Sequence, residues 1–280
     1  MACGSHGTSM FPFMPDITGI TIKMNEDGTI VFTTGTSDMG NGSVTTQCML
    51  ISEVLGIPLD HIAYIKTDTD AAMSDLGAYA SRGTYTSGHA AVKTAQIMRD
   101  KIAVLAAELL DTTTDNLDFH DDAVWCVDIH RKFVSMKDIA VHAREKHQED
   151  LSCSYMFHSE AGPMSSGAHF AKVQVDTVTG EIKVLEYAAV HDVGRVVNPM
   201  GITGQLEGGI SMGLGYALCE EMKLDSTGRN QTSSFKKYHI LNVKEMPKLS
   251  VDFLDSEEET GPYGAKSIGE CAVVPVAPAI

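Results

Sequence analysis

The chain has 280 residues, 43% of them hydrophobic, and a formal net charge of −16. This length accommodates one large domain or two smaller ones, and the apolar content is enough for a sizeable core. The acidic balance argues against a nucleic-acid partner and against anionic membrane surfaces, because both attract clustered Lys and Arg.

Six cysteines are scattered along the chain without the spacing of a zinc or iron–sulfur site. The eleven histidines also lack metal-ligand spacing, so we expect no metal held directly by protein side chains. The N-terminus has no signal-peptide pattern, and no apolar run approaches membrane-spanning length. Dispersed cysteines in such a chain indicate the reducing cytoplasm.

The first elements in chain order are a hairpin and a helix. Apolar residues alternate from Ile20 to Thr34 around the turn dipeptide Asp27-Gly28, which is typical of a β-hairpin. A Gly-rich loop at 35–42 follows, and Ser43 is the expected N-cap of a helix that stops at Gly56. This helix places Cys48 on its apolar face, so we expect Cys48 in the core.

The remaining elements follow from the same reasoning. Residues 68–83 are polar and irregular, and the apolar spacing after them predicts a long helix ending near Leu110. Further elements are expected as a strand at 61–67, a short element at 136–144, a hairpin at 170–190 turning at Thr179-Gly180, a loop at 191–204, a Gly-rich helix at 205–219, a strand at 249–254 and a helix beginning near 270.

Helices and strands mix without a regular βαβ repeat, which predicts an α+β fold with mixed sheets and packed helices. Residues 20–56 and 170–219 each read as hairpin, Gly-containing loop and helix. An internal repeat and simple economy of fold explain this likeness equally well. We therefore expect one domain over 1–280, with two similar subdomains at about 1–160 and 161–280 as the open alternative.

Two Gly-rich segments suit an oxygen-rich ligand. The loop 35–42 leads bare backbone into a helix N-terminus, where a phosphate can approach closely, but it lacks the third glycine of a dinucleotide fingerprint. In the segment 75–87, small residues and hydroxyls surround Arg82 and offer many hydrogen-bond donors. The alternatives are an ordinary turn and a solvated loop.

A third Gly-rich segment, 261–270, ends in Glu270. It is not a P-loop, because a P-loop places glycine directly before its lysine. A carboxylate that ends such a turn can be held rigidly as a base, although a surface charge is the alternative. His191-Asp192 suggests a proton relay, but no nucleophile motif accompanies it.

Taken in order, the motifs resemble those of the molybdenum hydroxylases of the xanthine dehydrogenase and aldehyde oxidase family, in the second molybdenum-binding domain. The similarity covers nearly all the chain, with a looser match over 111–160. The motifs are Gly35–Gly42 with Leu55–Pro58, Asp68–Asp70 with Ser81–Thr84, Val190–Pro199 with Gln205–Gly209, and Gly261–Glu270 with Pro275–Ile280.

The resemblance assigns a role to each matching position. The residues beside the pterin would be Gly40, Asn41 and Gly42, those at the phosphate or nucleotide end Ser81, Arg82, Gly83 and Thr84, the pterin hydrogen-bond partner Gln205, and the catalytic base Glu270. Most members carry Gln where this chain has Asn41. Asn keeps the amide but is one methylene shorter.

The implied activity is hydroxylation of an N-heterocycle, purine-like or xanthine-like, with water as the oxygen source. Molybdenum would be held by the dithiolene of molybdopterin, free or as the cytosine dinucleotide, which explains the missing protein ligand set. The alternatives are aldehyde oxidation by the same centre and a non-catalytic fragment that does not hold cofactor alone.

The resemblance also implies partners. The family subunit is longer, so the chain looks truncated, and the other half of the molybdenum subunit should supply further contacts. FAD and [2Fe-2S] clusters are expected on partner subunits, because no such module is present in this sequence. We therefore expect the isolated chain to be inactive.

Overall fold

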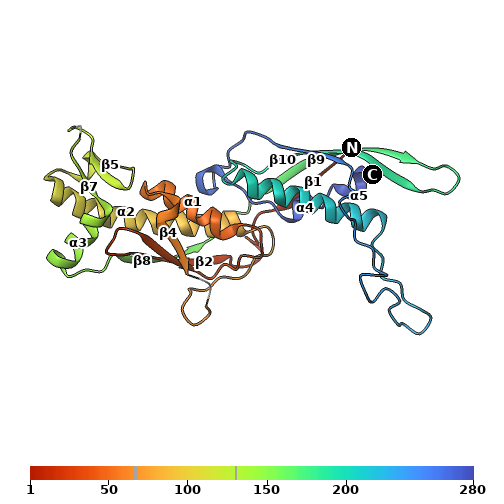
Figure 1. The fold of residues 1–280 in the computed structure, drawn as a ribbon, viewed down its shortest axis with the longest axis horizontal. Helices are drawn as coiled ribbons and strands as arrows, with labels where there is room; N and C mark the ends of the chain where they lie inside the picture. Colours follow the sequence, from red (N-terminus) through yellow and green to blue (C-terminus); the bar gives the residue numbers. More distant parts are fainter. Residues whose placement is uncertain (66–67, 130) are drawn as a thin grey trace. The chain divides into compact units, whose positions relative to one another are not determined.

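The computed structural model describes residues 1–65, 68–129 and 131–280, and the chain divides into two compact units. The N-terminal unit comprises residues 9–162. The C-terminal unit comprises residues 163–280 together with residues 1–8. Figure 1 shows the helices and strands of both units.

The N-terminal unit contains a four-stranded sheet in the order β4-β3-β2-β8. Its strands are β2 (Ile17–Met24), β3 (Ile30–Thr34), β4 (Ile62–Ile65) and β8 (Ser152–His158). The hairpin prediction is confirmed, with Met24 opposite Ile30 and Gly28 at φ 89° in the turn. The predicted continuation of β4 through Lys66 and Thr67 lies outside the described residues.

Helices pack beside this sheet, and a small second sheet accompanies them. The elements are α1 (Ser43–Leu55), η1 (Leu59–His61), η2 (Gly83–Ser87), α2 (Gly88–Leu110), η3 (Thr114–Asn116), β5 (Leu117–His120), β6 (Ala123–Cys126), β7 (Phe133–Ser135) and α3 (Met136–His147). The strands β5 to β8 were not predicted.

The ends of α1 show one success and one error of sequence reasoning. The helix ends at Gly56, which takes the left-handed conformation at φ 66° as predicted. Its N-cap, however, is Gly42 and not Ser43, because Gly42 is itself left-handed at φ 73° and the helix begins at the next residue. Cys48 is half-buried, so the buried face of α1 is turned slightly from the predicted one.

The C-terminal unit has a sheet in the order β1-β9-β10-β11. Its elements are β1 (Ala2–Gly7), β9 (Met164–Val175), β10 (Ile182–Asp192), α4 (Pro199–Leu218), β11 (Lys248–Phe253), η4 (Pro262–Gly264), η5 (Glu270–Ala272) and α5 (Val276–Ala279). The core joins sheet residues such as Tyr187 to Leu206, Ile210 and Leu214 of α4.

The helix α4 begins six residues earlier than predicted. The Asn198 side chain accepts a hydrogen bond from the Gly201 backbone N–H (3.1 Å), and Pro199 occupies the first helical turn. An Asn cap followed by Pro is a favoured helix start. The residues Asn198 and Pro199 therefore indicate the start of this helix, whereas the sequence analysis expected a loop over 191–204.

The two sheets share one pairing pattern. In each, the first strand of a hairpin (β2 or β9) pairs antiparallel with an outer strand (β8 or β1). The second strand of the hairpin (β3 or β10) pairs parallel with the strand that follows the next helix (β4 or β11). Within the described parts of the chain, no helix is long and apolar enough to span a membrane.

Candidate functional site

The loop before α1 is organised by one carboxylate. Asp38 Oδ1 accepts hydrogen bonds from the backbone N–H groups of Gly40 (2.8 Å) and Gly42 (3.4 Å), and Oδ2 accepts from Val44 (3.4 Å). Asn41 Oδ1 accepts from the Ser43 N–H (3.3 Å). The amides at this helix N-terminus thus already face a negative charge. The loop therefore suits a neutral polar ligand edge better than a phosphate.

Gly40 lies at the exposed tip of this loop, at φ 91°. A Cβ built on it meets no described atom within 4 Å, so the backbone there is open to an approaching molecule. Its conformation favours glycine, because few other residues adopt positive φ without strain.

Arg82 is turned inward, away from the role implied by the family resemblance. Its side chain is 1% exposed, and every guanidinium N–H has an acceptor in the N-terminal unit. The acceptors, 2.5–3.1 Å away, are the carboxylates of Asp16 and Asp75, the carbonyl oxygens of Ile17 and Gly77, and the hydroxyl of Thr18. No guanidinium donor is left for a phosphate.

The buried ion pairs of Arg82 instead shape the loop around it. Ala80 and Ser81 are both left-handed, at φ 49° and 45°, a conformation that costs free energy for residues with a Cβ. Gly83 and Thr84 follow at the start of η2, a π-helical turn. A Cβ on Gly83 would meet no atom of the described residues within 4 Å, so their packing does not require glycine there.

Buried polar side chains are found on α1 and on η2, two elements that are in contact. Among the described residues, Ser43 Oγ, both amide atoms of Gln47 and Thr86 Oγ1 have no hydrogen-bond partner. Gln47 is 2% exposed and Thr86 is fully buried. An unsatisfied buried polar group costs about 1–3 kcal/mol. These atoms fit a region that is completed by a polar ligand.

Gln47 is a candidate ligand-binding residue that the sequence analysis did not identify. It lies four residues after Ser43, so both side chains project from one face of α1. The sequence signal for a buried functional amide was a polar Gln on the same helix as the apolar residues Leu50, Ile51 and Val54.

Glu270 is the first residue of η5 and is exposed. The two residues after it, Cys271 and Ala272, are fully buried and anchor the turn in the core. Against this anchor lies Gly209 of α4, where a Cβ would come within 2.5 Å of the Ala272 Cβ. The glycines of α4 therefore allow the helix to approach the Glu270 turn closely.

Gln205 lies one helical turn before Gly209 on α4 and is half-buried. A Cβ built on its neighbours Gly204 and Gly208 meets no atom of the described residues within 4 Å outside the helix's own backbone. The C-terminal unit therefore presents the Gln205 amide on smooth, open backbone, on the helix that contacts η5.

Two motifs that are distant in sequence meet in the C-terminal unit. The Lys266 backbone N–H donates to Val193 O (2.8 Å), and the Lys266 ammonium lies 2.8 Å from Asp192 Oδ2. Burial opposes ionisation, but hydrogen bonds from Lys266 and Ser256 lower the pKa of Asp192 below its ordinary value. These contacts hold the segment that leads to Glu270.

The suggested relay between His191 and Asp192 does not exist as such, because alternation along β10 turns the two side chains to opposite faces. His191 is instead fully buried, 2.7 Å from His169 Nε2 through its own Nε2. His169 Nδ1 lies 2.8 Å from the Tyr187 hydroxyl. Cys271 Sγ lies 3.8 Å from His191 Nδ1 and donates to Ser165 O.

These four buried side chains are electrically neutral. Burial lowers the pKa of His169 and of His191 to about 4, and the neighbouring His191 lowers that of His169 further. Burial also raises the pKa of the Cys271 thiol to about 11 and that of Tyr187 above its ordinary value. This row of contacts ends at Cys271, the residue next to Glu270. The buried side chains therefore support the Glu270 turn and do not supply a charge.

The predicted site residues thus fall into two sets. Gly40 to Gly42 and Ser81 to Thr84 belong to the N-terminal unit, on α1 and η2 or the loops before them. Gln205 and Glu270 belong to the C-terminal unit, on two elements in contact.

Known proteins resemble the chain throughout. The sequence profile of the molybdopterin cofactor-binding domain matches residues 1–247. The chain is 31% identical over its whole length to a putative xanthine dehydrogenase molybdenum-binding subunit of Escherichia coli K12, of which it covers 38%. Over 95% of its length it is 35% identical to a probable hypoxanthine oxidase of the same strain, of which it covers 28%.

A solved structure gives the same result for the fold. Quinoline 2-oxidoreductase from Pseudomonas putida 86 matches 99% of the chain with a TM-score of 0.90 at 24% sequence identity, and 38% of that protein is covered. The chain belongs to the molybdopterin cofactor-binding domain family. Within it, the chain is a member of the molybdenum hydroxylases related to xanthine dehydrogenase. The family and the mixed α+β fold predicted from sequence are confirmed, and the chain spans 28–38% of the length of these relatives.

Proposed function

We propose that the chain forms part of a molybdenum hydroxylase that hydroxylates an N-heterocycle with water as the oxygen source, and that Glu270 is its base. The observation that carries this proposal is the Glu270 turn: an exposed carboxylate on a fully buried anchor, against a helix of glycines that also bears Gln205. The names of two relatives, a xanthine dehydrogenase subunit and a hypoxanthine oxidase, favour a purine-like substrate.

The orphaned polar atoms near α1 and the open backbone at Gly40 and Gly83 fit molybdopterin as the bound group. When bound, this group supplies the two-electron redox chemistry. In the C-terminal unit, the Gln205 amide would hydrogen-bond the pterin. Glu270 would take up the proton that the oxygen nucleophile must lose.

In the N-terminal unit we propose that Arg82 has a structural role and that its neighbours bind the cofactor. Because its guanidinium is fully occupied, Arg82 would hold the loop while the hydroxyls and backbone N–H groups of Ser81, Gly83 and Thr84 meet the phosphate end. Asn41 and its flanking glycines would meet the pterin edge. Both the free pterin and its cytosine dinucleotide suit these groups, and mass spectrometry of the released cofactor distinguishes them.

We further propose that the chain works with partners: the rest of a molybdenum subunit and subunits carrying FAD and iron–sulfur clusters, in the cytoplasm. The chain covers only 38% of its xanthine dehydrogenase relative. Large apolar side chains are also exposed in the C-terminal unit, including Met200, Tyr216, Phe235 and Val243. Large exposed apolar patches are unusual on monomers. We expect no stoichiometric molybdenum in the isolated chain.

The test is Glu270→Gln in the assembled enzyme, with Glu259→Gln, an exposed glutamate eleven residues earlier, as matched control. General-base catalysis contributes about 10²–10⁴-fold, so reduction of the centre by substrate in a single turnover should slow at least 10²-fold. Molybdenum content should stay unchanged. A rate within a few-fold of the parent would refute the role of Glu270, and a panel of purines and aldehydes identifies the substrate class.

A further inference from the structure

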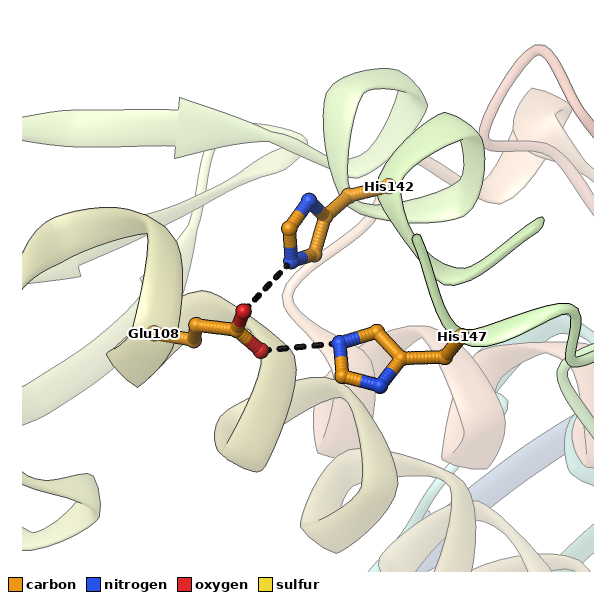
Figure 2. A group of neighbouring side chains, drawn as sticks. All are labelled: Glu108, His142 and His147. Atoms are coloured by element: carbon orange, nitrogen blue, oxygen red, sulfur yellow. Dashed lines mark hydrogen bonds and ion pairs between the residues drawn. The ribbon is translucent and has the colours of Figure 1, made fainter. Parts of the chain in front are cut away.

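Three metal-ligating side chains converge in the N-terminal unit, on helices outside the loops discussed above. Figure 2 shows Glu108 of α2 pointing toward His142 and His147 of α3. Glu108 Oε2 lies 2.8 Å from His147 Nε2, and Oε1 lies 3.4 Å from His142 Nε2. One ligand atom from each residue falls within 4.8 Å of the others.

We propose that Glu108, His142 and His147 form a binding site for a divalent transition-metal ion, with Zn²⁺ as the best match. Two imidazole nitrogens and one carboxylate oxygen are a ligand set that zinc accepts, with water completing a tetrahedron. The set is too rich in nitrogen for Mg²⁺ or Ca²⁺, which prefer oxygen ligands.

The spacing of the donors fits the size of such a site. Zinc–nitrogen and zinc–oxygen bonds of about 2.0–2.2 Å put the ligand atoms of a tetrahedron about 3.3 Å apart. The two distances to Glu108 lie on either side of this value. These two distances involve different Glu108 oxygens, and one ligand atom from each residue lies within 4.8 Å of the others, so binding one ion requires side-chain rotations that bring the three atoms closer together.

The state of His142 supports a missing partner. Its side chain is 18% exposed, and its Nε2 atom is buried. Among the described residues this atom makes no hydrogen bond, and it lies 3.4 Å from Glu108 Oε1. A metal ion between the three side chains would satisfy this nitrogen. His147 and Glu108 are more exposed, which leaves a path for the ion and room for water.

The scaffold beneath the three side chains is firmly packed. The last turns of α2 are anchored in the core by the buried side chains of Leu105 and Leu110. One face of α3 is anchored in the same way by Ile139, Ala140 and Ala143. Glu108 lies near the C-terminal end of α2, where a negative charge is unfavourable and a bound cation is favourable.

The site is separate from the proposed cofactor loops. Glu108 lies 20 residues after Gly88, the first residue of α2 and the neighbour of η2. At 1.5 Å per residue, this is about 30 Å along the helix axis. The metal would therefore join the end of α2 to α3 and would take no part in chemistry at the proposed molybdenum centre.

The experiment is calorimetric titration of ZnCl₂ into the full chain carrying Cys3→Ser, so that the exposed Cys3 thiol does not compete. The variants are Glu108→Gln, His142→Gln and His147→Gln. The matched control is His61→Gln, because His61 forms a single exposed pair with Asp122 (3.2 Å) and has no second histidine beside it among the described residues. MgCl₂ serves as the metal control.

We expect one Zn²⁺ per chain, an affinity at least tenfold weaker in each of the three variants, and an unchanged affinity in the control. Zinc should also raise the melting temperature of the parent, and EDTA should reverse this rise. The proposal is overturned by a lack of one-to-one binding, by parental affinity in the three variants, or by equal weakening in His61→Gln. A purely hydrogen-bonded cluster would lower the melting temperature of the variants without any zinc dependence.

Discussion

The two units build sheets with the same pairing pattern but bury polar groups in opposite ways. The N-terminal unit contains a charged set, in which the buried Arg82 guanidinium is paired with Asp16 and Asp75. The C-terminal unit contains a neutral set, in which His169, Tyr187 and His191 of the sheet and the nearby Cys271 contact one another without ionisation. Each solution avoids an isolated buried charge.

The difference follows from what each set can do to avoid that charge. Arginine does not lose its proton in proteins, so a buried guanidinium must be fully paired. Histidine, tyrosine and cysteine escape the cost of burial by staying neutral. The charged set can therefore position a loop through many directed hydrogen bonds, whereas the neutral set supports a turn and responds to pH.

The largest expected effect comes from breaking the charged set. Asp16→Asn keeps the shape but leaves Arg82 with too little negative charge, and breaking a buried pair costs about 3–5 kcal/mol. Trp125, the single tryptophan, lies in the N-terminal unit, so its fluorescence during urea unfolding reports this loss. The exposed pair of Lys101 and Glu149 gives the control, Glu149→Gln, for which we expect no measurable shift. Equal midpoints for the two variants would show that Arg82 is not held as described.

The next effect is a pH response confined to the C-terminal unit. The folded state lowers the pKa of His169 and His191 to about 4, so protonation favours unfolding. Their contribution is complete above pH 6.5 and is lost as pH falls from 6.5 toward 4. At pH 5.5 the loss is about 1.4 kcal/mol for each histidine.

Hydrogen exchange of the β9 and β10 amides, followed by mass spectrometry between pH 7 and 5 and corrected for intrinsic exchange, measures this response. The double variant His169→Gln/His191→Gln should have a flatter pH dependence, although it is less stable at pH 7. An identical pH slope in parent and double variant would contradict the neutral set.

A smaller effect concerns the contact that supports Glu270. Gly209→Ala would bring its new Cβ to 2.5 Å from the Ala272 Cβ, and such overpacking costs about 1–3 kcal/mol. Gly208→Ala, on the open side of the same helix, should instead raise stability by about 0.5–1 kcal/mol. Melting temperatures of the two variants should therefore shift in opposite directions, and a shift in the same direction would argue against close packing of α4 on η5.

The sequence predicted correctly those helix and strand ends that are signalled by neighbouring residues. The hairpin turn at Asp27-Gly28 and the stop of α1 at Gly56 depend on left-handed glycines, which neighbouring sequence reveals. The strands β5 to β8 were missed because they lie in the segment 111–160, whose pattern is weak, and because β5, β6 and β7 have only three or four residues each. Their pairing is decided by partners elsewhere in the unit, as when β8 joins β2.

The sequence by itself determined the family, the mixed fold and the candidate base, because ordered motifs and glycine-rich turns are local features of the chain. Glu270 as base remains a prediction. Only the tertiary structure decided which way the polar side chains of these motifs point. It turned Arg82 inward to Asp16 and Asp75, and it brought Glu108 to two histidines more than thirty residues away. The reason is physical: pairing a buried charge or assembling a ligand set requires groups from different elements, and their distances are set by packing.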